Sequence, residues 1–449
     1  MNRDIRKSLD EDAMGRFQWL AVAICVMLVM LDGFDVLVMA FTASSISAEW
    51  HLTGAQLGVL FSAGLFGMAG GSLCLAPLAD RFGRQAIILV CLGLITVGML
   101  LSAFAQSSLE LGILRALTGV GIGGMLASVS VITAEYSSSK WRSTCVAFQA
   151  TGYPIGATLG GMVAAVLLVH SGWRSVFIFG AICTALMVPA VLLWLPESVD
   201  FLLAKQPRGA LDKLNKLLRK MGRPALASLP AKPVKVVGDG TTGGFGALFA
   251  PGMLRSTLLV WSGFFLLMFT FYFALSWTPK LLVAAGLSAQ QGITGGVLMN
   301  LGGIVGGTLF GLLAARLELG RLTAASLCLT ALAMAAFGYA TGALGLAFVA
   351  AFGIGVFIFG GMAGLYSFAP IIYPAAVRST GMGWAIGIGR LGAILAPLTA
   401  GLLLDNGWTP PQLYYVFALP LLLAVVAVLA IRSPSAPARR KLGNAVAAH

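Results

Sequence analysis

Long runs of apolar residues, separated by short polar segments, recur along the whole chain. A helix needs about 20 apolar residues to cross the roughly 30 Å of hydrocarbon in a bilayer, and each run is long enough. Small residues recur every four positions within several runs, a pattern that lets membrane helices pack closely. The sequence predicts twelve spans, at residues 18–43, 54–79, 86–106, 109–134, 144–169, 173–195, 256–279, 289–315, 321–341, 343–370, 380–405 and 411–431.

The distribution of charge predicts the orientation of these spans. Of the 449 residues, 58% are hydrophobic and 10% are charged, against about 25% charged residues in soluble domains. If both termini are cytoplasmic, 25 of the 29 lysines and arginines lie on the inner side, as the positive-inside rule requires. The net charge of +13 is then topogenic and suits contact with anionic lipid headgroups. We expect a multi-pass protein of the cell inner membrane, with lipid but no nucleic acid as a partner.

A long basic segment divides the spans into six plus six. The later part of its residues 201–220 has the pattern of an amphipathic basic helix, which we expect to lie on the inner membrane surface. Residues 223–245 have the composition of a flexible linker, and the chain from 433 has that of a disordered basic tail. The sequence predicts a cytoplasmic N-terminal tail, a six-helix bundle, a cytoplasmic central loop, a second six-helix bundle and a cytoplasmic C-terminal tail, at residues 1–17, 18–195, 196–255, 256–431 and 432–449.

The two six-span halves share short sequence matches. Arg142-Ser-Thr opens the fifth span, and Arg378-Ser-Thr opens the eleventh. With the same offset, Gly156 matches Gly392. Two parallel six-helix repeats with a substrate site between them are a common design of secondary transporters. We therefore expect an all-α integral membrane fold built from two six-helix repeats.

The first span contains two acids, in the sequence Asp32-Gly-Phe-Asp35. A carboxylate costs several kcal/mol to hold in lipid, so acids inside spans are rare and usually functional. Residues three apart share one face of a helix. Because removal from water disfavours the charged form, Asp32 can bind a proton from the outer face and release it inside. Asp32 is our first choice for the coupling proton and Asp35 for its support or for the outer gate, although the assignment within the pair stays open.

Two arginines also lie inside spans. Arg115 and Asp35 lie about 9 Å and 12 Å below the outer ends of their spans, at about 1.5 Å per residue, so they can pair. A purely structural bridge and snorkelling of Arg115 to the outer interface are the alternatives. Arg390 lies about 15 Å deep in its span. Its planar guanidinium suits a carboxylate, either that of Asp32 or that of an anionic substrate.

The loop between the second and third spans reads Asp80-Arg81-Phe-Gly-Arg84. It resembles the signature loop of the major facilitator superfamily, which contains Asp-Arg-x-Gly-Arg. The resemblance implies that Glu135 and Arg142, at the next inner loop, form a salt-bridge cluster with these residues that holds the inner gate closed. Solvated surface charge is the alternative.

The acid pair of the first span, the superfamily loop and Arg390 together resemble the aromatic acid:proton symporters of that superfamily. Arg115, Glu135, Arg378 and Arg390 fall at positions that match charged residues of this family. The resemblance covers essentially the whole chain. It implies transport of 4-hydroxybenzoate, protocatechuate, benzoate or a related acid together with protons.

Polar side chains inside the later spans are candidates for the substrate site. Tyr272, Asn300 and Trp384 each carry a polar group that needs an interior partner, and we expect them to line the site with Arg390. The aromatic rings of the seventh span could stack on an aromatic substrate. For most of those rings, however, we favour the interpretation that they face lipid or anchor the helix at the membrane interface.

We therefore predict a secondary active transporter, acting as a monomer, that imports an aromatic carboxylate by proton symport through alternating access. Three alternatives remain: a proton-coupled exporter or antiporter of hydrophobic compounds, an importer of an aliphatic dicarboxylate such as muconate, and a transporter-like sensor. The sequence has no nucleophile–His–acid constellation, no metal-ligand cluster and no ATP-binding loop. We expect no enzymatic activity, no cofactor and no metal.

Overall fold

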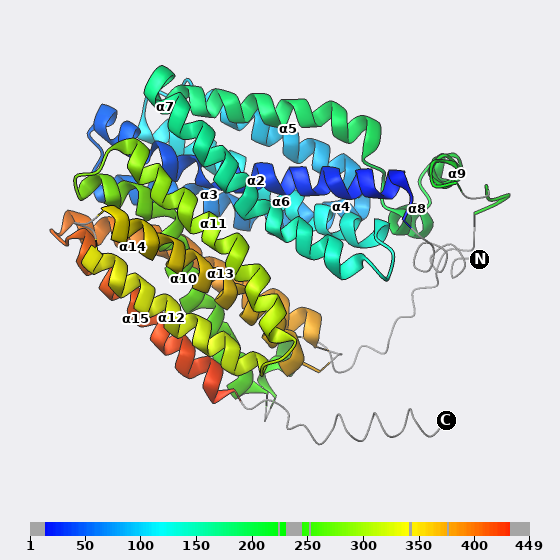
Figure 1. Cartoon of the computed structure of the whole chain (residues 1–449). Coiled ribbons are helices and arrows are strands. Elements are labelled where there is room, and N and C mark those ends of the chain that lie inside the picture. The colour runs from blue at the N-terminus through cyan, green and yellow to red at the C-terminus, as the bar shows by residue number, and fades with distance from the viewer. Residues whose placement is uncertain are drawn as a thin grey trace. The chain divides into compact units, whose positions relative to one another are not determined.

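The computed structural model describes residues 14–222, 225–229, 245–250, 253–340, 344–374 and 377–431. Within these ranges the chain is helical and forms no strand. Figure 1 shows the long helices that dominate it. The predicted C-terminal tail, most of the predicted linker at 223–245 and most of the predicted N-terminal tail lie outside the described residues.

The first half of the chain forms α2 (Arg16–Trp50), α3 (Gly54–Cys74), α4 (Ala76–Phe82), α5 (Arg84–Ser102), α6 (Ser108–Tyr136) and α7 (Arg142–Trp194) (Figure 1). As a straight rod, the 53 residues of α7 would reach about 80 Å, far more than a bilayer needs. Gly172 breaks α7 with a φ of 73°, which glycine adopts without steric cost. The break lies between the predicted fifth and sixth spans.

The central loop forms α8 (Val199–Lys205), α9 (Ala210–Lys220) and η1 (Phe245–Phe249). The second half forms α10 (Leu254–Ala284), α11 (Ala289–Ala314), α12 (Leu319–Ala340), α13 (Leu344–Ile372), α14 (Arg378–Asp405) and α15 (Pro410–Ala430). In the described ranges, eleven helices are long and apolar enough to cross a membrane, with α7 counted once. Its break raises the number of spanning segments to the predicted twelve. The predicted all-α fold with twelve spans is confirmed.

The predicted end of the first span was wrong. α2 continues seven residues beyond residue 43, to Trp50, and ends at His51 in the left-handed conformation with φ 50°. Asp35 consequently lies about 22 Å from the C-terminal end of its helix, not about 12 Å. Residues 44–50, which include several polar side chains, stay helical and extend α2 beyond its apolar part.

The predicted amphipathic helix of the central loop forms, but its apolar face is not free for a membrane. The segment divides into α8 and α9, because Gln206 and Gly209 adopt left-handed conformations between them. Leu214, Leu217 and Leu218 of α9 are buried inside the protein. Since these leucines pack against protein, the apolar face cannot insert into the inner membrane surface as predicted.

The described chain groups into two compact units. The first unit contains the helices up to α9, together with Leu275–Leu301 and Pro397–Gly407. The second contains the described residues in 245–274, 302–396 and 408–431. The first unit therefore includes one end each of α10, α11 and α14.

Close packing of α2 against α7 holds the acidic segment of α2 in place. A Cβ atom on Gly33 would overlap the carbonyl group of Tyr153, and one on Gly156 would overlap the backbone of Met30. Glycine is required at both positions because backbone meets backbone there. The predicted close packing of the fifth span is thus present, and it buries the α2 segment that contains the two acids.

Candidate functional site

The two acids of α2 are buried and lack protein partners. Asp32 and Asp35 are each 2% exposed. None of their four carboxylate oxygens accepts a hydrogen bond from the part of the chain that the structure describes. Burying an unpaired carboxylate costs free energy, so stability does not explain these residues. A buried, unpartnered acid inside a membrane span indicates a functional site.

Arg115 of α6 is also buried, at 3% exposure. One guanidinium nitrogen lies within bonding distance of the sulfur of Met99 at 2.9 Å, the hydroxyl of Ser102 at 3.3 Å and the hydroxyl of Thr118 at 3.0 Å. The guanidinium carbon lies 5.0 Å from the centre of the Phe177 ring, within the range of a cation–π contact. Neutral groups therefore hold this arginine, and its Nε has no partner among the described residues.

Asp35 and Arg115 line the same cavity, which has a volume of about 30 Å³. Thr118 and Ser276 also line this cavity, called the Asp35 cavity below. In the described structure, no hydrogen bond or ion pair joins Asp35 to Arg115. The predicted partners are thus neighbours across a small cavity rather than a direct salt bridge.

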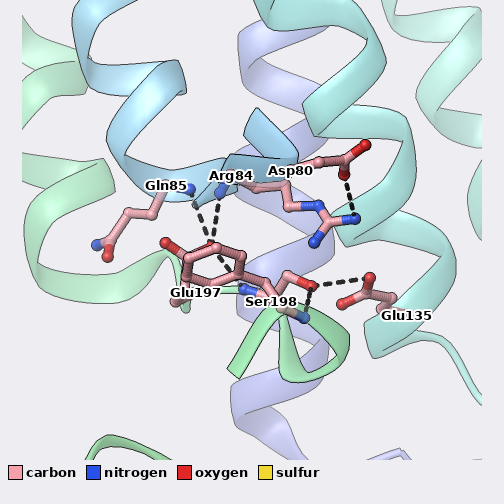
Figure 2. A network of polar contacts seen from close by, with 7 residues as sticks. Asp80, Arg84, Gln85, Glu135, Glu197 and Ser198 are labelled. Atoms are coloured by element: carbon pink, nitrogen blue, oxygen red, sulfur yellow. Dashed lines mark hydrogen bonds and ion pairs between the residues drawn. The ribbon is translucent and has the colours of Figure 1, made fainter. Parts of the chain in front are cut away.

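A polar network joins the start of α5, the end of α6 and the segment that follows α7 (Figure 2). The Arg84 guanidinium lies 3.0 Å from a carboxylate oxygen of Asp80. One carboxylate oxygen of Glu197 accepts hydrogen bonds from the backbone N–H groups of Arg84 at 2.7 Å and Ser198 at 2.8 Å, and more weakly from that of Gln85 at 3.3 Å. Glu197 therefore caps the N-terminus of α5, where the helix dipole favours negative charge.

The same network reaches the end of α6. The Ser198 hydroxyl donates to the carboxylate of Glu135 at 2.9 Å. The Tyr136 hydroxyl donates to the backbone carbonyl of Glu197 at 2.7 Å. Figure 2 shows Glu135, Ser198 and Glu197 in one chain of contacts. This network holds the start of α5, the end of α6 and the segment after α7 together.

Three further arginines that the sequence singled out at the ends of spans have different surroundings. Arg81 is exposed, with its guanidinium carbon 5.3 Å from the Phe82 ring. Arg142 donates to the backbone carbonyl of Ala134 at 3.0 Å. Arg378 donates to the backbone carbonyl of Tyr373 at 3.3 Å. Arg142 and Arg378, which match in the sequence repeat, thus both bond carbonyl groups near the end of the preceding helix.

Three of the predicted substrate-site residues belong to the second unit. Arg390 of α14 and Tyr272 of α10 are partly buried and interact electrostatically. Within the described residues, Arg390 has no hydrogen bond or ion pair. Trp384 is 46% exposed and stacks on Trp261 with ring centres 6.1 Å apart. A cation inside a span that lacks a protein anion is available for an anionic ligand.

Asn300 is fully buried in the first unit, and its amide nitrogen donates to the carbonyl of Gly296 in the same helix at 2.9 Å. Its side-chain oxygen has no partner among the described residues. The structure therefore assigns Asn300 to a different unit from Arg390, Tyr272 and Trp384.

Glu197, Ser198 and Tyr366 were missed by the sequence analysis. Glu197 and Ser198 follow Pro196 directly after the sixth span, where an acid and a helix-capping serine are the available signal. Tyr366 of α13 interacts electrostatically with Tyr272 and Arg390. Tyr366 could have been found by the same criterion as Tyr272, because both are tyrosines inside an apolar run.

Comparison with known proteins identifies this class of fold and site. The profile of the Major Facilitator Superfamily matches residues 22–385, so the chain belongs to this superfamily of membrane transporters, in its aromatic acid transporter family. The chain is 33% identical to a gallate transporter of Pseudomonas putida over 430 residues, which cover 95% of this chain and 94% of the relative. It is 30% identical to the 4-hydroxybenzoate transporter PcaK of the same organism over 429 residues, with 95% of each chain covered.

A solved structure supports the fold alone. The inward open conformation of the xylose transporter XylE from Escherichia coli superimposes with a TM-score of 0.72 and is 19% identical in sequence. The match covers 94% of this chain and 98% of that one. The superfamily match and the two transporter relatives make the protein a multi-pass membrane transporter and not an enzyme.

Proposed function

We propose that the protein imports an aromatic carboxylate together with at least one proton, by alternating access in the cell inner membrane. The observation that carries this proposal is the pair of buried, unpartnered carboxylates of Asp32 and Asp35 on α2. We further propose a monomer with both termini in the cytoplasm. Residues 18–195 and 256–431 would be its two bundles, and residues 196–255 its inner central loop.

Asp32 is the first candidate for the coupling proton. An unpaired carboxylate in a buried site is favoured in its neutral form, because the charged form loses its hydration. Asp32 can then take up a proton from the outer side and release it inside when the site is exposed there. Asp35, beside Arg115 at the Asp35 cavity, would support this exchange.

Arg390 is the candidate for the substrate carboxylate. Its guanidinium has the fork geometry that binds a carboxylate through two hydrogen bonds, and within the described chain it lacks a protein anion. Tyr272, Tyr366 and Trp384 would hold the ring and its substituents. Asn300, in the first unit, is a separate candidate for a polar contact with the substrate. The substrates in the names of the relatives, gallate and 4-hydroxybenzoate, are aromatic acids of this kind.

Uptake into proteoliposomes tests the proposal. Purified protein is reconstituted, a pH gradient with an acidic outside is imposed, and benzoates, phenylpropionates and dicarboxylates are compared. We expect the gradient to drive accumulation of hydroxylated or unsubstituted benzoates above equilibrium. Accumulation of neutral or cationic compounds in the opposite direction would favour an exporter, and preference for muconate would favour the dicarboxylate importer.

A further inference from the structure

The Asp35 cavity is completed by a residue from a distant part of the sequence. Ser276 of α10 lines it, together with Asp35 of α2 and Arg115 and Thr118 of α6. All four residues belong to the first compact unit. The volume of about 30 Å³ exceeds the roughly 10–15 Å³ that one water molecule needs.

The polar groups of this cavity lack enough protein partners. Both carboxylate oxygens of Asp35 and the Nε of Arg115 have no hydrogen bond to any described residue. Buried water typically makes about three hydrogen bonds to such groups. A donor and an acceptor that line one cavity without touching are therefore well placed for a bridging water.

The charged and titratable groups that face Asp35 come from three helices. They are Asp32 on α2 itself, Arg115 on α6 and Cys183 on α7. The residues that α3 and α10 contribute to the cavity carry no titratable group. Ser276 is thus a neutral hydrogen-bonding group in a site where the charge depends on Asp35.

We propose that Asp35, Arg115 and Ser276 together bind a water molecule, and that Ser276 makes α10 sensitive to whether Asp35 carries a proton. A carboxylate only accepts hydrogen bonds, whereas a protonated carboxyl also donates one. The water must therefore reorient when Asp35 gains or loses its proton, and its hydrogen bond to Ser276 changes at the same time. Ser276 is a positioning residue, because it acts on Asp35 through the water.

Trp277, the next residue in α10, connects the Ser276 site to α14 and α3. The indole N–H of Trp277 donates to the carbonyl of Pro397 in α14 at 3.3 Å. Its ring packs edge-on against Phe61 of α3, with ring centres 5.2 Å apart, and Phe61 itself lines the Asp35 cavity. Protonation of Asp35 therefore biases the contact that joins α3, α10 and α14 within the first unit.

This inference rests on the proposed proton symport. The experiments are chosen so that a failure of the water site can be told from a failure of the symport. The Ser276→Ala variant is reconstituted in proteoliposomes beside Ser262→Ala, which removes an exposed hydroxyl from the same helix. We expect Ser276→Ala to keep gradient-free exchange of substrate. The midpoint of its pH profile for driven uptake should move to more alkaline pH by about one unit, because the water that hydrogen-bonds to the charged carboxylate loses one of its partners. Ser276→Thr and Ser262→Ala should match the wild type.

Infrared difference spectroscopy of the wild-type protein gives a readout independent of transport. A pH change should produce a bound-water band that shifts in water enriched in oxygen-18 and disappears in Asp35→Asn. A wild-type pH profile in Ser276→Ala, or the absence of that band, would overturn the water site. If wild-type liposomes show no gradient-driven uptake but the band is present, the proton symport fails and the water site stands.

Discussion

The carboxylate of Asp405, at the end of α14, accepts a hydrogen bond from the backbone N–H of Gly54 at 2.6 Å. Its second oxygen accepts one from the N–H of Ala55 at 2.8 Å. These N–H groups begin α3 and have no partner within their own helix. A residue 351 positions away thus caps α3 from another repeat, and it does so inside one compact unit. We interpret this contact as a clasp that favours the conformation seen here.

Removing the Asp405 clasp should weaken this conformation. A cap of this kind contributes about 0.5–2 kcal/mol, so Asp405→Ala should shift the conformational equilibrium by about two- to thirtyfold. The measure is the labelling rate of Leu57→Cys, a position that is 1% exposed on α3, in a background without other cysteines. Faster labelling is expected in the variant. Asn406→Ala, at an exposed neighbour that bonds only its own helix, is the control and should label like the parent.

The approach of α14 to α3 depends on glycine. A Cβ atom on Gly401 would overlap the carbonyl group of Gly54. Gly401→Ala should therefore push the helices apart and reduce uptake about tenfold or more, since overpacking typically costs about 1–3 kcal/mol. Gly383→Ala is the matched control, because the space around Gly383 in the same helix is open. Equal uptake rates for the two variants would show that the close contact is not needed for transport.

The polar network around Glu197 predicts unequal effects for two acids. Glu197 accepts three backbone hydrogen bonds, so Glu197→Ala should lower the free energy of unfolding by about 1–3 kcal/mol. The Asp80 carboxylate is 73% exposed, and an exposed ion pair contributes about 0–1 kcal/mol. Asp80→Asn should therefore have the smaller effect on thermal unfolding in detergent. A larger loss for Asp80→Asn would contradict Glu197 as the centre of this network.

The network also illustrates what a sequence can and cannot predict. Apolar run length is a local property, and it predicted the twelve spans, including the division of α7 between the fifth and sixth and the place of the two acids within the first. Two of the three backbone N–H groups that Glu197 accepts from, those of Arg84 and Gln85, lie more than 110 residues away in the sequence, and no residue pattern identifies them. Similarly, the alternation of Leu214, Leu217 and Leu218 with lysines is the same whether the apolar face meets lipid or protein. Only the tertiary packing of α9 shows that these leucines contact protein.

The unpartnered acids of α2 predict a loss of coupling. Asp32→Asn keeps the shape of the side chain but cannot exchange a proton at neutral pH. We expect gradient-driven accumulation to disappear while exchange of labelled for unlabelled substrate, without a gradient, continues. Both are measured in the same proteoliposomes, so that exchange reports on folding. Full accumulation by Asp32→Asn would remove Asp32 from the coupling mechanism, and the same test on Asp35→Asn would then identify which acid carries the proton.

Arg390 predicts a loss of substrate affinity rather than of folding. Within the described residues no protein anion balances this guanidinium, so Arg390→Ala leaves no buried charge unpaired. A charge-assisted hydrogen bond contributes about 1.5–3 kcal/mol, and its loss should weaken binding of the acid by about ten- to a hundredfold. Competition by unlabelled acids measures this, and Arg390→Lys should recover only part of the affinity, because an ammonium group lacks the planar fork. Arg321→Ala removes an arginine that is 81% exposed and serves as the control. Unchanged competition in Arg390→Ala would instead assign Arg390 a structural role.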